Sequence, residues 1–127
     1  LGAGDGDLAA ARARLGPGRI LGASCYNRLD LAQAAVAAGA DYVAFGAAFA
    51  SATKPGAVRA PLELYRTARR ALAARIVAIG GITVANAPAL VTAGVDALAV
   101  ITALFDADDV ARRAREFQSL FSRIESP

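Results

Sequence analysis

Val77-Ala78-Ile79-Gly80-Gly81-Ile82 is a run of apolar residues interrupted by a pair of glycines. The apolar part predicts a short buried strand, and the glycine pair leaves the following backbone N–H groups uncovered by side chains. We expect a helix to begin at Thr83, and the N-terminal end of a helix favours an anion. The stretch therefore predicts a strand end that can receive a phosphate.

A similar corner follows in the next strand, where residues 97–101 are mostly apolar and lead into Thr102-Ala103. Outward from the two corners, apolar runs and turn residues predict strands that alternate with helices. The predicted strands are 19–24, 41–46, 76–79 and 97–101. The predicted helices are 8–14, 27–38, 61–73, one from residue 85 or 86 to residue 93, and 108–121, and a long loop covers 47–60.

An internal repeat supports this pattern. Residues 38–45 resemble residues 93–100, because in each copy a glycine ends a helix and an aspartate opens an apolar strand. Strands that are apolar on both faces are typical of parallel sheets covered by helices. Four such strands fit either half of a (β/α)8 barrel or a small doubly wound sheet.

The corners on the last two strands favour the barrel, because phosphate sites of (β/α)8 barrels form from the loops after those strands. The predicted fold class is therefore α/β. We therefore expect residues 1–127 to form a single domain that supplies the C-terminal half of a TIM barrel, with the N-terminal βα units absent from this chain. A length of 127 residues, 56% of them hydrophobic, is enough for one compact core.

The charge pattern argues against several classes of protein. The net charge of +3 comes mainly from arginines scattered over predicted helix faces, so we expect solvated helix surfaces and no nucleic-acid partner. No apolar run reaches the length of about 20 residues that a membrane span needs. With one cysteine and no visible signal peptide, we expect a cytoplasmic protein without disulfides.

The sequence contains no histidine, which removes the commonest general base and the commonest zinc ligand. A metal would then bind oxygen ligands, and this favours Mg²⁺. The single cysteine, Cys25, has no histidine to activate it, so we do not expect it to act as a nucleophile.

Several polar residues follow the predicted strands, where the active groups of a barrel lie. Lys54 is the only lysine in an arginine-rich chain and suits a phosphate, although it also fits an ordinary exposed loop. Asp5 follows a glycine-rich turn and fits either a helix cap or a Mg²⁺ ligand. Ser24 ends a strand and could reach a substrate oxygen or begin the turn to Asn27.

Together these segments resemble the thiamine phosphate synthase family over essentially the whole chain. The resemblance rests on Gly2-Ala3-Gly4-Asp5, Gly22-Ala23-Ser24, Ala38-Gly39-Ala40-Asp41-Tyr42-Val43, Gly46 to Lys54, Ile79-Gly80-Gly81-Ile82-Thr83 with Asn86, and Ala93-Gly94-Val95-Asp96. It implies a (β/α)8 barrel that joins 4-amino-2-methyl-5-hydroxymethylpyrimidine diphosphate to 4-methyl-5-(2-phosphoethyl)thiazole. The products are thiamine phosphate and diphosphate.

The resemblance also implies a dissociative mechanism and a set of roles. Diphosphate leaves first, while Mg²⁺ and cationic groups take up its charge, and the thiazole nitrogen then captures the pyrimidine cation. Asp5 resembles a Mg²⁺ ligand, and Ser24 and Lys54 resemble the residues that hold the pyrimidine diphosphate and carry the catalytic roles. The residues that resemble the thiazole phosphate site are Ser51, Ala52, Thr53, Gly81, Ile101 and Thr102.

This chain departs from the family pattern at several positions. The family usually has Gly-Gln-Glu-Asp where residues 2–5 are Gly-Ala-Gly-Asp, so the expected metal geometry around Asp5 is less complete. Ser51 stands where the family usually has Thr, and Thr102 stands where it usually has Ser, so both positions keep a hydroxyl. The upstream half would carry the other Mg²⁺ ligand and a pyrimidine-binding segment, so we expect residues 1–127 alone to be inactive.

Two other interpretations stay open. A related thiazole tautomerase would share the fold, but Asp5, Lys54 and the absence of histidine argue against it. A non-catalytic, phosphate-binding half-barrel could instead form a homo-oligomer that covers its open sheet edges.

Overall fold

The computed structural model describes residues 1–51 and 56–125, with side chains through residue 122. Its four strands form one parallel sheet in the order β1-β2-β3-β4, so the predicted alternation of strands with helices is confirmed. The strands are β1 (Gly22–Tyr26), β2 (Tyr42–Phe45), β3 (Arg75–Ile79) and β4 (Ala97–Ala99). The helices are α1 (Leu8–Leu15), α2 (Leu29–Ala37), α3 (Leu62–Ala71), α4 (Ala87–Ala93), α5 (Thr102–Phe105) and α6 (Val110–Glu125).

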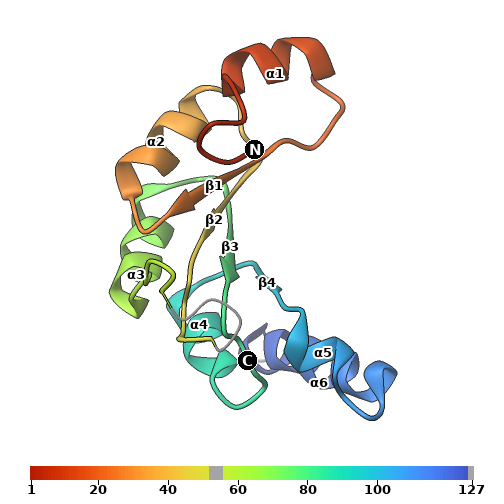
Figure 1. Ribbon diagram of the computed structural model, residues 1–127. Helices are drawn as coiled ribbons and strands as arrows, with labels where there is room; N and C mark the ends of the chain where they lie inside the picture. The colour runs from red at the N-terminus through yellow and green to blue at the C-terminus, as the bar shows by residue number, and fades with distance from the viewer. Residues whose placement is uncertain (52–55, 126–127) are drawn as a thin grey trace.

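The sheet curves, and α2, α3 and α4 lie along its outer side (Figure 1). Strand residues alternate between the two faces of the sheet. Val43, Phe45 and Ile76 are fully buried in the core, whereas Tyr42 and Ile79 are 36% and 45% exposed. The described helices therefore cover one face of the sheet.

Strand β1 begins at Gly22 rather than at residue 19. The Arg19 carbonyl accepts a hydrogen bond from the Arg12 side chain, and the Leu21 N–H donates to Asp41 Oδ2 at 2.8 Å. Because side chains bind these backbone groups, residues 19–21 do not extend the strand.

Two helix starts also differ from prediction, and one helix was not predicted. Helix α2 begins at Leu29, and its N-cap is Arg28 rather than Asn27. The Arg28 side chain pairs with Asp30 in the first turn and does not cap the backbone. Helix α6 begins at Val110 rather than at residue 108, and the short helix α5 after β4 was not predicted.

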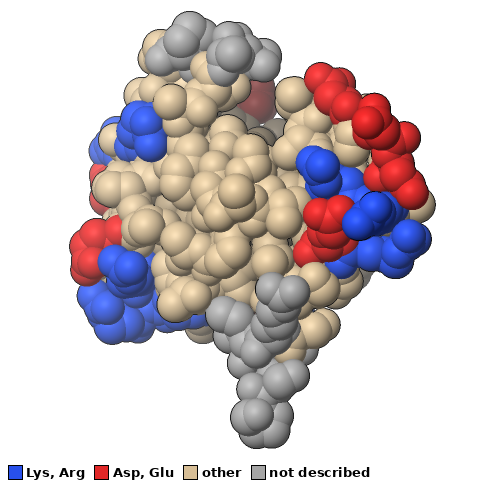
Figure 2. All heavy atoms as spheres, turned by 90° about the horizontal axis from the view of Figure 1, so that it is seen from below, with Lys and Arg blue, Asp and Glu red and all other residues tan. Residues whose placement is uncertain are grey.

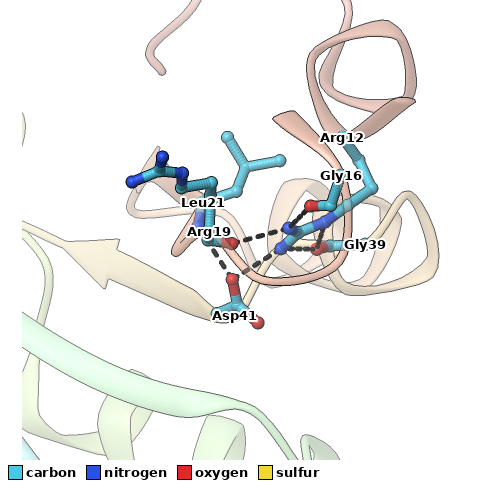
Figure 3. A network of polar contacts seen from close by, with 6 residues as sticks. All are labelled: Arg12, Gly16, Arg19, Leu21, Gly39 and Asp41. Carbon is cyan, nitrogen blue, oxygen red and sulfur yellow. Dashed lines mark hydrogen bonds and ion pairs between the residues drawn. The ribbon is translucent and has the colours of Figure 1, made fainter. Parts of the chain in front are cut away.

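A side-chain network that we call the first latch joins α1 to the amino ends of β1 and β2 (Figure 3). Arg12 donates from Nε and Nη2 to the Gly39 carbonyl at 3.0 and 2.8 Å and forms an ion pair with Asp41. Asp41 Oδ2 in turn accepts the Leu21 N–H, so one carboxylate connects a helix and two strands. The first latch consists of Arg12, Gly39 and Asp41.

A second latch repeats the first between α3 and the amino ends of β3 and β4. Arg69 donates to the Gly94 carbonyl and, at 2.8 Å, to Asp96 Oδ2, which also accepts the Ile76 N–H at 2.8 Å. The second latch consists of Arg69, Gly94 and Asp96. Arg12 and Arg69 are 20% and 33% exposed, so these two arginines are not the solvated helix-face residues that the sequence suggested.

Charged side chains on the face in Figure 2 form two groups on either side of an uncharged area. Basic residues of α3 and α6 pair with a glutamate of the same helix, and each glutamate is shared by two arginines, so their charge is partly balanced locally. These pairs are Glu63 with Arg66 and Arg70, and Glu116 with Arg112 and Arg113. Among the helices that the structure describes, none has the length and apolar character needed to cross a membrane.

Candidate functional site

The carboxyl ends of parallel strands meet at one edge of a sheet, and most predicted site residues lie at this edge. At the end of β3, Gly80 and Gly81 have positive φ values of 98° and 66°, which glycine adopts readily. A Cβ added to Gly81 would lie 2.5 Å from the Phe49 carbonyl oxygen. We call Gly80 and Gly81 the glycine corner, and residues 46–50, which pass over it, the crossing segment.

Backbone hydrogen bonds fix the crossing segment on the glycine corner. Ala48 donates its N–H to the Ile79 carbonyl at 2.9 Å, and Phe49 donates to the Gly80 carbonyl at 3.1 Å. Ala47 is also bonded to the returning chain, since its N–H donates to Val58 and its carbonyl accepts from Ala60. The segment after β2 is thus held against the end of β3 before it reaches Ser51.

Tyr65 of α3 holds the end of β2 from below the crossing segment. Its hydroxyl donates to the Phe45 carbonyl at 2.7 Å, and its ring meets the Phe45 ring edge to face, with centroids 5.9 Å apart. Burial raises the pKa of the Tyr65 hydroxyl, so this group remains a hydrogen-bond donor. The start of the crossing segment is therefore fixed by a core residue.

Asn86 holds the other side of the glycine corner. Its Nδ2 donates to the Gly81 carbonyl at 3.0 Å, and its Oδ1 accepts the Thr83 N–H at 2.7 Å. Helix α4 begins at Ala87, after a turn, so the expected helix start at Thr83 is wrong. The Thr83 N–H is bound by Asn86 and does not serve as a donor for a phosphate.

The geometry of the peptide bonds shows where the backbone N–H groups of the glycine corner point. The C=O and N–H groups of a trans peptide point in opposite directions. Because Phe49 takes the Gly80 carbonyl and Asn86 takes the Gly81 carbonyl, the N–H groups of Gly81 and Ile82 point away from these partners. The corner can therefore present backbone donors, but they come from the glycine loop and not from the start of α4.

The end of β4 forms a neighbouring corner. Ile79 pairs with Ala99 in the sheet, so Gly81 and Ile101 leave adjacent strands at the same edge. Ile101 is 75% exposed, and Thr102 is the exposed first residue of α5. The structure thus brings together three of the predicted phosphate-site residues, Gly81, Ile101 and Thr102.

Asp5 and Ser24 lie together at the end of β1. Asp7 caps α1, since its Oδ1 accepts the Ala9 N–H at 3.0 Å, so Asp5 is not the helix cap. Asp5 instead accepts the Gly2 N–H at 2.7 Å and closes its own turn. The turn into α2 is closed by a hydrogen bond to the Cys25 carbonyl, which leaves Ser24 in the strand.

Tyr26 is a residue of this end that the sequence reasoning did not select. Its hydroxyl accepts the Ala3 N–H at 3.1 Å, and its φ of 56° is unusual for a residue other than glycine. The only feature of the sequence that could have pointed to Tyr26 is its place two residues after Ser24. We call Gly2, Asp5, Ser24 and Tyr26 the β1 corner.

Some predicted residues cannot be placed. Ala52, Thr53 and Lys54 lie outside the described residues.

Cys25 is buried, and desolvation raises the pKa of its thiol to about 11, which keeps it protonated and agrees with the expectation that it is not a nucleophile.

The donors at the β1 corner are oxygens, which suit Mg²⁺. Asp5 is exposed and supplies one carboxylate, and Ser24 supplies a hydroxyl. Among the described residues, no three histidine, cysteine, aspartate or glutamate side chains gather as a metal site. Asp5 therefore fits as one ligand of a Mg²⁺ ion that takes its other ligands from phosphates, water or further residues.

Comparisons with known proteins show which family the chain resembles. A family model described as thiamine monophosphate synthase matches residues 1–104. The thiamine-phosphate synthase of Methylobacillus flagellatus is 59% identical over 122 residues, which are 96% of this chain and 58% of the relative. That of Chromobacterium violaceum is 60% identical over 121 residues, with 95% and 58% covered.

Solved structures give a consistent result. A thiamine phosphate pyrophosphorylase from Pyrococcus furiosus matches with a TM-score of 0.85 and 33% identity, covering 98% of this chain and 58% of that one. A 3-hexulose-6-phosphate synthase from Salmonella typhimurium shares the fold at 24% identity, with a TM-score of 0.70. This chain spans little more than half the length of the curated relatives it matches. On the family model and the sequence identities, the chain belongs to the thiamine monophosphate synthase family.

Proposed function

We propose that the protein carrying this chain is a thiamine phosphate synthase, a transferase of thiamine biosynthesis. It would join the pyrimidine diphosphate to the thiazole phosphate and release diphosphate. One observation carries this proposal beyond the family match: the crossing segment is bonded to the glycine corner. This contact places the chain that leads to Ser51 beside Gly81, as one phosphate site built from both segments requires.

We further propose that residues 1–127 are the C-terminal half of a (β/α)8 barrel. The curved parallel sheet with helices on its outer side supports this, as does the half-exposed inner row that includes Tyr42 and Ile79. In a closed barrel these side chains would fill the interior. The remaining strands and the rest of the site would come from another part of the protein.

The thiazole phosphate would bind at the ends of β3 and β4. Gly81, Ile101 and Thr102 would contact it there, and backbone N–H groups of a glycine loop suit a phosphate because no side chain blocks their approach. Ser51, Ala52 and Thr53 would line the same site from the crossing segment. The acceptor substrate would thus be held mainly by backbone donors and hydroxyls.

The pyrimidine diphosphate would bind beside Ser24 and Lys54. A dissociative reaction develops negative charge on the leaving diphosphate, and fixed cations and hydrogen-bond donors stabilise that charge in the transition state. Lys54 would supply the cation and Ser24 a hydroxyl donor, while Asp5 would hold Mg²⁺. When bound, Mg²⁺ neutralises diphosphate oxygens. No histidine is required for these roles, in agreement with its absence from the chain.

The test is formation of thiamine phosphate by the full-length protein that contains residues 1–127. Purified protein receives both substrates with Mg²⁺, and chromatography detects thiamine phosphate and diphosphate. We expect product from the full-length protein and none from residues 1–127 alone. Binding of a phosphate ester without product by the full-length protein would contradict the proposal and favour a non-catalytic phosphate-binding barrel.

A further inference from the structure

We propose that Tyr26 is a positioning residue that holds the turn of residues 2–5 over the end of β1. It would thereby keep Asp5 and Ser24 in place for the diphosphate substrate. The identity of that ligand rests on the proposed function, whereas the tether itself rests on the structure alone.

The backbone at Tyr26 has a conformation that is unusual for an aromatic residue. A φ of 56° lies in the left-handed region, which is costly for a bulky aromatic residue. The pairing of β1 with β2 also shifts there: Ser24 pairs with Ala44, but Tyr26 pairs with Phe45, so Cys25 is an extra residue. Such a bulge redirects the side chain that follows it, here the phenol of Tyr26.

The redirected phenol reaches the turn that carries Asp5. Its hydroxyl accepts the Ala3 N–H at 3.1 Å, while the ring remains 40% exposed. A half-exposed ring contributes less by burial than a core aromatic, so packing alone does not account for the strained backbone. The contact with Ala3 gives the phenol a specific partner instead.

Three polar residues converge where Gly2 has no side chain. A Cβ placed on Gly2 would lie 3.1 Å from Tyr26 Oη, 3.4 Å from Asp5 Oδ2 and 3.9 Å from Ser24 Cβ. The missing side chain therefore lets the phenol, the carboxylate and the serine approach one another. This proximity connects Tyr26 with the two residues that the sequence had selected.

The turn has few other links to β1. Leu1 lies along β1, since its nitrogen donates to the Gly22 carbonyl at 2.7 Å and its carbonyl accepts the Ser24 N–H at 2.8 Å, and the turn closes on itself through Asp5 and Gly2. Within the described residues, Tyr26 provides the side-chain hydrogen bond from β1 to the turn. Removal of this hydroxyl should release Ala3 and let Asp5 shift relative to Ser24, while the fold persists.

Tyr42 offers a matched control on the neighbouring strand. It is 36% exposed, and its ring lies on Gly22, where a Cβ would come within 2.0 Å of a ring carbon. Within the described residues its hydroxyl makes no hydrogen bond to the turn of residues 2–5. The change Tyr42→Phe therefore removes the same atom from a tyrosine of the neighbouring strand without breaking the proposed tether.

The experiment compares Tyr26→Phe and Tyr42→Phe in the full-length protein. Hydrogen exchange of the Ala3 amide, followed by NMR, reports on the tether, and the KM values of the two substrates report on the site. We expect Tyr26→Phe to speed Ala3 exchange and to raise the KM for the pyrimidine diphosphate about fivefold, the size expected for one lost hydrogen bond. The KM for the thiazole phosphate should stay the same, and Tyr42→Phe should change none of these values.

Unchanged Ala3 exchange in Tyr26→Phe would overturn the tether, and an equal rise in both KM values would overturn the link to the diphosphate substrate. If the wild-type protein forms no thiamine phosphate, the proposed function fails. Ala3 exchange then still decides whether Tyr26 holds the turn.

Discussion

The two ends of the sheet are built in different ways. At the amino ends of the strands, the two latches use charged side chains: an arginine from a helix, a glycine carbonyl and an aspartate that accepts a strand N–H. At the carboxyl ends, the crossing segment and the glycine corner are joined by backbone groups, and the residues that remain are small, hydroxylated or exposed.

This difference separates stability from binding. The charged groups of the latches are paired with each other and with backbone groups, so they stabilise the fold and are not available to bind a ligand. At the carboxyl end, side chains such as Tyr65 and Asn86 bind backbone carbonyls, and the N–H groups of the glycine corner face away from these contacts, which leaves room for a substrate close to the backbone. The same division between a stabilising end and a functional end is general among (β/α)8 barrels.

We expect the largest effect, a loss of turnover, from Lys54→Ala in the full-length protein. Loss of a cation that faces the leaving diphosphate should lower kcat by about a hundredfold or more without a change in unfolding free energy. Steady-state kinetics and urea denaturation measure the two quantities. Arg14→Ala, at an exposed position of α1, is the control. Unchanged turnover in Lys54→Ala would remove Lys54 from the mechanism.

Gly81→Ala tests the backbone construction of the carboxyl end. The new Cβ would lie 2.5 Å from the Phe49 carbonyl oxygen at a positive φ, so the corner must shift. We expect a loss of unfolding free energy of about 1–3 kcal/mol and a raised KM for the thiazole phosphate. Gly18→Ala is the control, because a Cβ there meets nothing within 4 Å. Equal behaviour of the two variants would contradict a close contact at the corner.

Arg12→Ala and Arg69→Ala test the opposite end. Each removes hydrogen bonds from a charged group to backbone carbonyls, so each should lower the free energy of unfolding by about 2 kcal/mol. Because the latches lie away from the proposed substrate sites, both KM values should remain as in the wild type. A change in substrate KM in either variant would break the separation between the two ends.

Asp41→Asn should give the smallest effect, a loss of stability whose size depends on pH. The Leu21 N–H, and then the Arg12 guanidinium, hold the pKa of the Asp41 carboxyl below its usual range. The carboxylate therefore stabilises the fold above the unfolded pKa of about 4, and this contribution is lost as the pH falls through the lower folded pKa. Urea denaturation between about pH 5 and pH 2 should show a shallower loss of stability for Asp41→Asn than for the wild type.

The exposed Asp108→Asn provides the control for this pH series, since it removes a carboxylate outside the latch. It should keep the wild-type dependence on pH. The same slope in Asp41→Asn would mean that the first latch contributes nothing to acid stability.

Much of the fold could be predicted from local patterns. The strand over residues 76–79 was predicted to within one residue of β3, because an apolar run that ends at a pair of glycines leaves few alternatives. The repeated glycine and aspartate of the latches were also visible as a repeat. Their arginine partners were not, because Arg12 and Arg69 come from helices that are distant in the sequence from the aspartates they bind.

The candidate site shows a similar limit. The sequence suggested Gly81, Ile101 and Thr102, and the structure brings them to adjacent strand ends. It did not suggest Tyr26, whose importance depends on a bulge and a left-handed backbone that appear only when β1 pairs with β2. Asp5 was predicted to be either a helix cap or a Mg²⁺ ligand. The hydrogen bond from the Ala9 N–H to Asp7 shows that Asp7 is the cap.

The sequence by itself determined the alternation of strands and helices, the two corners and the family, because these depend on residue types at short spacing. Only the tertiary structure decided that the crossing segment lies on the glycine corner, that Asn86 takes the Thr83 N–H, and that Asp5, Ser24 and Tyr26 meet around Gly2. These contacts join residues from different strand ends. Their geometry is set by the packing of the sheet, which no local pattern contains.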